Sequence, residues 1–78
     1  MAGPWDDRDR LVERQREVLI EARKTAGFNQ TQLGKALGKS QSFVSNYERG
    51  QRRLDMVDFI LIARVLGVEP GELLRRLG

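Results

Sequence analysis

Hydrophobic residues recur along this chain at helical spacing, and no segment alternates between apolar and polar residues as a strand does. In residues 9–26 the apolar positions fall on one face of a helix of about 3.6 residues per turn; they are Leu11, Val18, Leu19, Ala22 and Ala26. Residues 56–66 are the most apolar segment, which favours a helix packed in the core. The pattern predicts an all-α protein with helices at residues 9–26, 31–37, 41–49, 56–66 and 70–77.

Polar side chains mark where three of these helices begin. Asn29 is followed three residues later by Gln32, and Asp55 is followed in the same way by Asp58. This is the spacing of a capping box, in which two side chains satisfy backbone N–H groups at the start of a helix. Ser40 is placed to cap the helix that begins at residue 41.

Glycines mark where the helices end. Gly27, Gly38, Gly50, Gly67 and Gly78 each follow a predicted helix. Gly38 is expected in the left-handed conformation, which a residue without a Cβ adopts at little cost. The last helix has Pro70 at its first position, and Glu69 before it is expected to be a poor cap.

Residues 29–50, NQTQLGKALGKSQSFVSNYERG, read as two short helices separated by one glycine. Gly34 lies inside the first of them, where glycine costs about 1 kcal/mol relative to alanine. Close approach of the following helix is a physical reason for this residue. A helix-turn-helix requires a small residue here, a bend glycine (Gly38) and then a β-branched core residue (Val44). An ordinary helical hairpin with no role in DNA binding fits the same spacing.

The second of these helices has one wholly polar side. Wound at about 100° per residue, it turns Phe43, Val44 and Tyr47 to one side. The opposite arc contains only hydrogen-bonding side chains and one cation: Gln41, Ser42, Ser45, Asn46 and Arg49. These are the side chains that a helix needs to read base edges in the major groove of DNA.

The length of 78 residues suits one domain with a single core. Residues 1–9 are predicted to be a mobile N-terminal segment, or at most an extension of the first helix, and residues 10–78 to be the helix-turn-helix domain. The core is expected to join the fourth helix to the central stretch, with Phe59, Ile62, Ala63 and Leu66 packed against Leu33, Leu37 and Val44.

Composition excludes several classes of chemistry. The chain has no cysteine and no histidine, which excludes disulfides, thiolate or imidazole metal sites and the common nucleophile–histidine pairs. We therefore expect no metal, no cofactor and no enzymatic activity. The net charge of +3 gives only weak support for a polyanionic partner. No apolar run is long enough to span a bilayer and the N-terminus is too polar for a signal peptide, so a cytoplasmic location is expected.

The central stretch resembles the lambda-repressor-like family, the Cro/repressor (XRE) type of helix-turn-helix regulator found in phages and bacteria. The likeness covers residues 19–74 and rests on Arg23, on GFNQTQLGKALGKSQSFVSNYERG from Gly27, on IARVLGV at 62–68 and on Glu72 to Leu74. It implies five helices, with the third as the recognition helix. It also implies a sequence-specific transcriptional regulator, repressor or autoregulator, that binds a double-stranded DNA operator.

The resemblance assigns roles to individual side chains. Gln41 and Ser42 would face base edges, with Ser45 and Asn46 behind them. The DNA backbone would be contacted by Asn29 and Gln30 and by the arginines Arg49, Arg52 and Arg53. Arg23 and Glu48 match a pair that ties the first helix to the third, and both are expected to be structural. The sequence departs from the family at Lys39, in a turn position that is usually apolar, and at Phe43, where a small or polar residue is common.

The resemblance also suggests partners. Members usually bind operators as dimers, and Leu73, Leu74 and Leu77 form a plausible seam, although each leucine could equally pack within its own chain. An alternative function is an antitoxin of the same fold whose main partner is a toxin. Another is a controller protein of a restriction–modification system. A toxin-like or a methylase-like gene next to this one would distinguish these alternatives.

Overall fold

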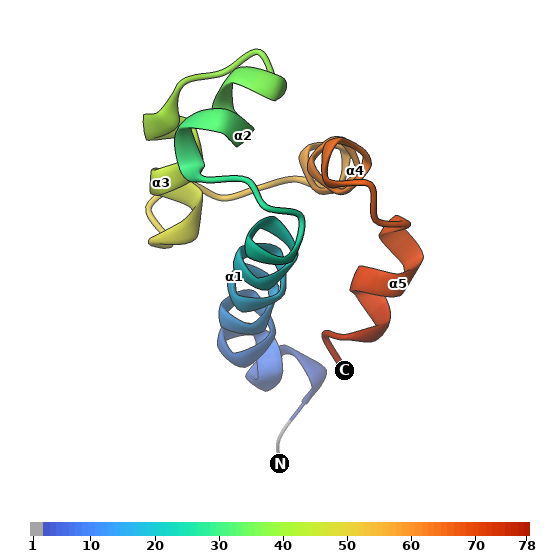
Figure 1. Cartoon of the computed structure of the whole chain (residues 1–78). Helices are drawn as coiled ribbons and strands as arrows, with labels where there is room; N and C mark the ends of the chain where they lie inside the picture. The colour runs from blue at the N-terminus through green and yellow to red at the C-terminus, as the bar shows by residue number, and fades with distance from the viewer. Residues whose placement is uncertain (1–2) are drawn as a thin grey trace.

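The computed structural model describes residues 3–78, and these residues form helices joined by short turns (Figure 1). A short 3-10 helix, η1 (Pro4–Asp7), leads into α1 (Arg8–Thr25). The four helices that follow are α2 (Gln30–Ala36), α3 (Gln41–Glu48), α4 (Met56–Leu66) and α5 (Pro70–Arg75). The described residues contain no strand, which confirms the predicted all-α fold, and the bounds of α4 are those expected from the sequence.

The helices surround one core. In Figure 1, α2 and α3 lie together on one side, α5 lies on the other side, and α4 lies between them above α1. The core contains residues from all five α-helices, with Tyr47, Leu19, Leu33, Ile62, Leu73, Val18 and Val44 as its largest fully buried side chains. The predicted contribution of α4 is confirmed, since Phe59, Ile62, Ala63 and Leu66 are all buried. Leu37 is only partly buried at the edge of this core.

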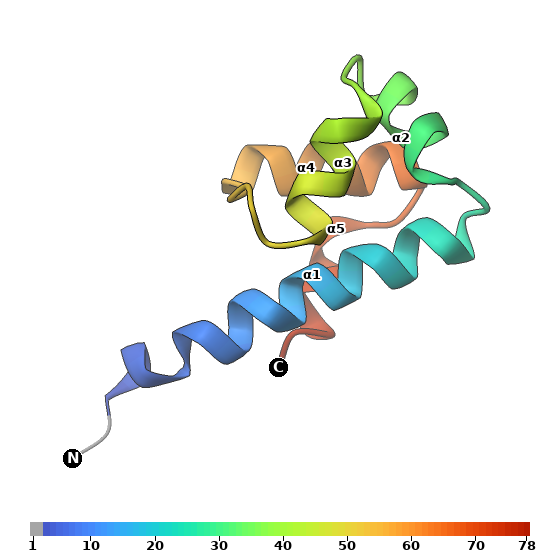
Figure 2. The same ribbon diagram turned by 90° about the vertical axis from the view of Figure 1, so that its left-hand side faces the viewer.

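Of the two arrangements expected for the N-terminal segment, the described residues adopt the second, an extension of the first helix. Pro4 begins η1 and α1 begins at Arg8, so residues 4–9 extend the first helix, while Met1 and Ala2 lie outside the described residues. A local hydrogen bond explains the early start, because the Asp6 carboxylate accepts from the Gly3 backbone N–H at 2.9 Å. The N-terminal half of α1 projects beyond the body of the protein (Figure 2). Leu11, expected in the apolar face, is therefore exposed.

The predicted caps are present at the helix starts. The Asn29 side chain accepts from the Gln32 backbone N–H at 2.7 Å, and Gln32 accepts from the Asn29 N–H at 2.9 Å. Asp55 and Asp58 form the same reciprocal pair at the start of α4. The expectation that Glu69 is a poor cap was wrong. Its carboxylate accepts from the Glu72 N–H at 3.2 Å, because its longer side chain can fold back over the first turn of α5.

Candidate nucleic-acid interface

Two glycines set the geometry of the turn between α2 and α3. Gly38 has φ +72°, the left-handed conformation expected of the residue that ends α2. A Cβ on Gly34 would lie 2.5 Å from the carbonyl oxygen of Ser40 and 3.1 Å from the backbone nitrogen of Gln41. Backbone atoms cannot move aside as a flexible side chain can. The close approach inferred from the sequence is therefore present, and only glycine fits at residue 34.

The start of α3 is held by a side chain from the same turn. The Ser40 hydroxyl accepts from the Phe43 backbone N–H at 3.2 Å. From this cap, α3 turns Val44 and Tyr47 into the core. The side chains assigned to the polar arc lie on its outer side, where Gln41, Ser42 and Arg49 are exposed and Ser45 and Asn46 are partly exposed.

A buried ion pair joins α1 to the end of α3. Arg23 Nε donates to Glu48 Oε2 at 2.7 Å, and Arg23 Nη2 donates to Glu48 Oε1 at 3.1 Å. The two side chains are only 10% and 5% exposed. Arg23 Nη1 also donates to the carbonyl oxygen of Phe28 at 3.0 Å, which fixes the chain between α1 and α2. The structure thus brings together the two residues that were expected to form a structural pair.

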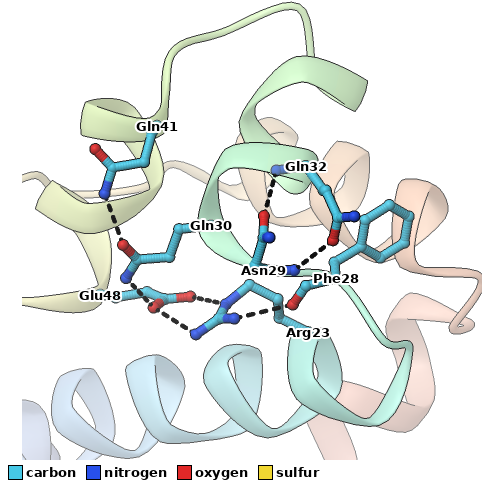
Figure 3. Close-up of polar contacts among 7 residues, drawn as sticks. All are labelled: Arg23, Phe28, Asn29, Gln30, Gln32, Gln41 and Glu48. Atoms are coloured by element: carbon cyan, nitrogen blue, oxygen red, sulfur yellow. Dashed lines mark hydrogen bonds and ion pairs between the residues drawn. The ribbon is translucent and has the colours of Figure 1, made fainter.

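Two glutamine amides extend this ion pair to the protein surface (Figure 3). Gln30 Nε2 donates to Glu48 Oε1 at 2.8 Å, and Gln30 Oε1 accepts from Gln41 Nε2 at 2.7 Å. A carboxylate can only accept, so Glu48 requires the Gln30 nitrogen to point towards it. The Gln30 oxygen then points towards Gln41 and requires a donor there. The charge of Glu48 therefore sets the orientation of both amides, and it leaves the Gln41 oxygen and one Gln41 N–H free.

The remaining polar residues near α3 are held in different ways. Arg49 Nη2 donates to Asn46 Oδ1 at 2.9 Å, so these two side chains are paired on the outer face. The guanidinium of Arg52 lies over the ring of Phe43, with 4.7 Å between its carbon and the ring centroid. Arg53 is exposed. Asn29 is engaged in its cap, as described above.

The two departures from the family pattern meet at one aromatic ring. Phe43 is partly buried against the core and contacts Tyr47 edge-to-face, with ring centroids 5.7 Å apart. Lys39 Nζ lies 5.7 Å from the centroid of the same Phe43 ring. The Phe43 ring therefore packs inward against the core and stays partly exposed. The turn stays closed at Lys39, whose backbone N–H donates to the Gly34 carbonyl at 2.8 Å.

Sequence reasoning assigned no role beside this surface to Arg16 or Tyr47. The guanidinium of Arg16 lies against Gly50, in the space that a Cβ there would fill. Arg16 stands seven residues before Arg23, which places both on one face of α1, and this spacing was the available signal. Burial raises the pKa of the Tyr47 hydroxyl far above its ordinary value. The charge of Glu48 raises it further and that of Arg23 opposes the shift.

Other kinds of site find no support in the part of the chain that the structure describes. Residues 3–78 contain no group of three histidine, cysteine, aspartate or glutamate side chains that could hold a metal ion. None of the described helices combines the length and the apolar character needed to cross a membrane.

Two comparisons with known proteins identify the family. A family model described as helix-turn-helix matches residues 19–73, well over half of the chain. The structure is similar to that of an XRE-family like protein from Pseudomonas syringae pv. tomato str. DC3000, with a TM-score of 0.85 and 38% sequence identity. This similarity covers 90% of the present chain and 85% of the other. A comparison with curated proteins gave no match. The chain belongs to the XRE family of helix-turn-helix proteins, which are DNA-binding regulators.

Proposed function

We propose that this protein is a sequence-specific transcriptional regulator that binds an operator with α3 in the major groove. Membership of the XRE family supports DNA binding in general. The orientation of the Gln41 amide carries the more specific proposal. Gln41 is exposed at the first position of α3, and its amide is fixed by the hydrogen bond to Gln30. A pre-oriented amide loses less conformational entropy when it binds a base.

The fixed amide matches one base in particular. Gln41 Nε2 uses one N–H on Gln30, and the Gln41 oxygen and the other N–H remain free. Adenine presents an N6 donor and an N7 acceptor in the major groove, and a glutamine with a free oxygen and a free N–H pairs with both. Ser42, Ser45 and Asn46 lie on the same outer face and would contact neighbouring bases. We assign adenine as the base that Gln41 reads.

Contacts to phosphate would hold α3 in the groove. Arg49, Arg52 and Arg53 lie in and just after the last turn of α3, where their guanidinium groups can reach the sugar–phosphate backbone. Asn29 and Gln30 at the start of α2 would contact the backbone on the other side of the recognition helix. The backbone contacts set register and affinity, while the α3 side chains set sequence preference.

The proposed dimer cannot use all three leucines suggested by the sequence. Leu73 is fully buried at 0% exposure and belongs to the core of its own chain. Leu74 is 47% exposed, and it lines an apolar groove together with Met56 and Leu77. Met56 is 70% exposed, which makes it the largest apolar surface beside Leu74. A dimer interface would therefore centre on Leu74 and Met56.

The first experiment is a fluorescence-anisotropy titration against the DNA upstream of this gene, with a shuffled duplex as the comparison. A regulator should prefer the native duplex by at least about a thousandfold at roughly physiological salt. Gln41→Ala should weaken operator binding by about 1–3 kcal/mol and relax the preference at one base pair. The matched control is Gln51→Ala, an exposed glutamine past the end of α3, which should leave base preference unchanged.

Two results would contradict the proposal. Equal loss of affinity for operator and random DNA in Gln41→Ala would remove Gln41 from base reading. Weak, salt-sensitive binding of the wild-type protein to both duplexes would leave no operator to read. In that case the main partner would be a protein, as in the antitoxin alternative.

A further inference from the structure

A cavity of about 220 Å³ lies beside the proposed DNA-binding surface. Its walls are the N-terminal half of α1, the C-terminal end of α3 and the loop between α3 and α4. Four arginines line it: Arg8 and Arg16 from α1, and Arg52 and Arg53 from the loop. Among the described residues that line it, Asp9 is the only acidic one.

These arginines are not neutralised by ion pairs within the described part of the chain. Four other arginines in residues 3–78 form ion pairs, namely Arg10, Arg14, Arg23 and Arg76. None of the four cavity arginines forms an ion pair within those residues. With Asp9 counted, the lining residues carry a formal charge of +3, from four arginines and one aspartate, although the guanidinium of Arg52 also lies over Phe43 and that of Arg8 over Trp5. A cavity with this lining attracts anions.

Two residues of this lining each have a buried polar atom that forms no hydrogen bond within residues 3–78. These atoms are Arg16 Nε and the hydroxyl oxygen of Tyr47. Tyr47 is 1% exposed, so its ring cannot turn to solvent to satisfy the hydroxyl. Arg16 Nε can only donate. Buried polar groups are almost always paired, so two orphans at one cavity indicate a missing partner rich in acceptor oxygens.

We propose that this cavity binds a small phosphate-bearing anion, and that the bound anion competes with DNA. A phosphate ester carries a charge of about −2 at neutral pH and three acceptor oxygens, which suits guanidinium donors and a tyrosine hydroxyl. The space corresponds to several water molecules, enough for a phosphate group with a short substituent. Competition rests on the proposed function, because Arg52 and Arg53 line the cavity and are also the assigned backbone contacts.

Calorimetric titration of the full chain with inorganic phosphate tests the site itself. Ionic strength is held constant with chloride, so that general screening cannot imitate binding. We expect saturable binding of one phosphate per chain. Arg16→Gln should raise the Kd at least tenfold, and Arg75→Gln, which removes the same charge from α5, should leave it within twofold. Absence of saturable binding, or equal loss in both variants, would overturn the proposal.

Tyr47→Phe is the second variant, and it keeps the aromatic ring in the core. Its thermal midpoint should equal or exceed that of the wild type, since the removed hydroxyl forms no hydrogen bond with any residue from 3 to 78. Its Kd for phosphate should rise about fivefold, the effect of one hydrogen bond. An unchanged Kd would show that the tyrosine hydroxyl does not contact the anion and would overturn the assigned site.

A DNA titration separates this proposal from the proposed function. Saturating phosphate should weaken operator binding by the wild-type protein, relative to chloride at equal ionic strength, and should weaken it less in Tyr47→Phe. Binding of phosphate without any operator preference would refute the proposed function and leave the anion site standing. Weaker DNA binding by Tyr47→Phe in chloride alone would instead assign the cavity to a phosphate of the DNA backbone and overturn competition.

Discussion

The ion pair between Arg23 and Glu48 should be the most sensitive polar contact in the domain. Arg23→Met removes both hydrogen bonds to Glu48 and the one to the Phe28 carbonyl, while a side chain of similar length fills the space. Glu48 would be left as an unpaired carboxylate in a site where its side chain is 5% exposed. Removing one partner of a buried pair destabilises a protein by about 3–5 kcal/mol. That is a large share of the stability of a small domain.

Replacing both partners should restore much of this loss. In the double variant Arg23→Met, Glu48→Met no charge remains in the site, and buried ion pairs replaced by apolar residues are often neutral or stabilising. Gln30 then loses the acceptor for its Nε2, which costs about 1–3 kcal/mol if it stays buried. The double variant should therefore unfold within about 2 kcal/mol of the wild type. Its stability should exceed that of either single variant.

Urea denaturation followed by circular dichroism measures these differences. The wild type, the two single variants and the double variant form a double-mutant cycle that isolates the coupling between Arg23 and Glu48. A loss of less than about 1 kcal/mol in Arg23→Met would refute the reasoning, because an exposed pair behaves in that way. Additive losses in the double variant would also refute it, since they would mean that the two charges do not compensate each other.

Three other predictions follow from single positions. Gly34→Ala should destabilise the protein by about 1–3 kcal/mol in urea denaturation, because the added Cβ would meet backbone atoms of Ser40 and Gln41. Gly71→Ala is the control, because its Cβ would meet only the flexible Glu69 carboxylate, and its stability should stay within about 1 kcal/mol of the wild type. Because the pKa of Tyr47 is raised, its contribution to the free energy of unfolding should be constant below pH 10.0, the ordinary value, and should fall as the pH rises further, by up to about 1.4 kcal/mol per unit. Alkaline denaturation of Tyr47→Phe should lack this contribution, and an identical profile would contradict it. Arg52→Ala should weaken binding to all DNA similarly and lower the salt slope of log K by about 1, whereas an unchanged slope would remove Arg52 from the backbone contacts.

The helix boundaries could be predicted because the interactions that set them are local. A capping box such as Asn29 with Gln32 involves residues three positions apart, so the sequence contains both partners side by side. The same is true of Gly38, whose left-handed conformation follows from the turn that it must make. Glu69 shows the limit of this reasoning. Glutamate is a poor N-cap on average, but in one rotamer the Glu69 side chain reaches the Glu72 N–H.

Which of two neighbouring residues in a helix is buried could not be predicted in the same way. Leu73 and Leu74 are adjacent and chemically identical, but one is fully buried and the other is half exposed. A step of about 100° around the helix separates them, and only the position of α5 against α1 and α4 decides which one faces the core. Arg16 was missed for a similar reason. Its place against Gly50 depends on how α1 crosses the end of α3.

The orientation of Gln41 depends on the buried residue Glu48, and this connects stability to the proposed base preference. Glu48 fixes the Gln30 amide, and the Gln30 amide fixes Gln41. Without the carboxylate in the double variant, Gln30 is free to turn and donate to the Gln41 oxygen. Gln41 would then present only N–H donors, which suit the N7 and O6 acceptors of guanine. The double variant should therefore stay folded but lose the proposed preference for adenine over guanine at one base pair. The change is measured by comparing the affinity of the double variant for the operator with its affinity for an operator that has guanine in place of that adenine. An unaltered preference would show that α3 alone orients the Gln41 amide.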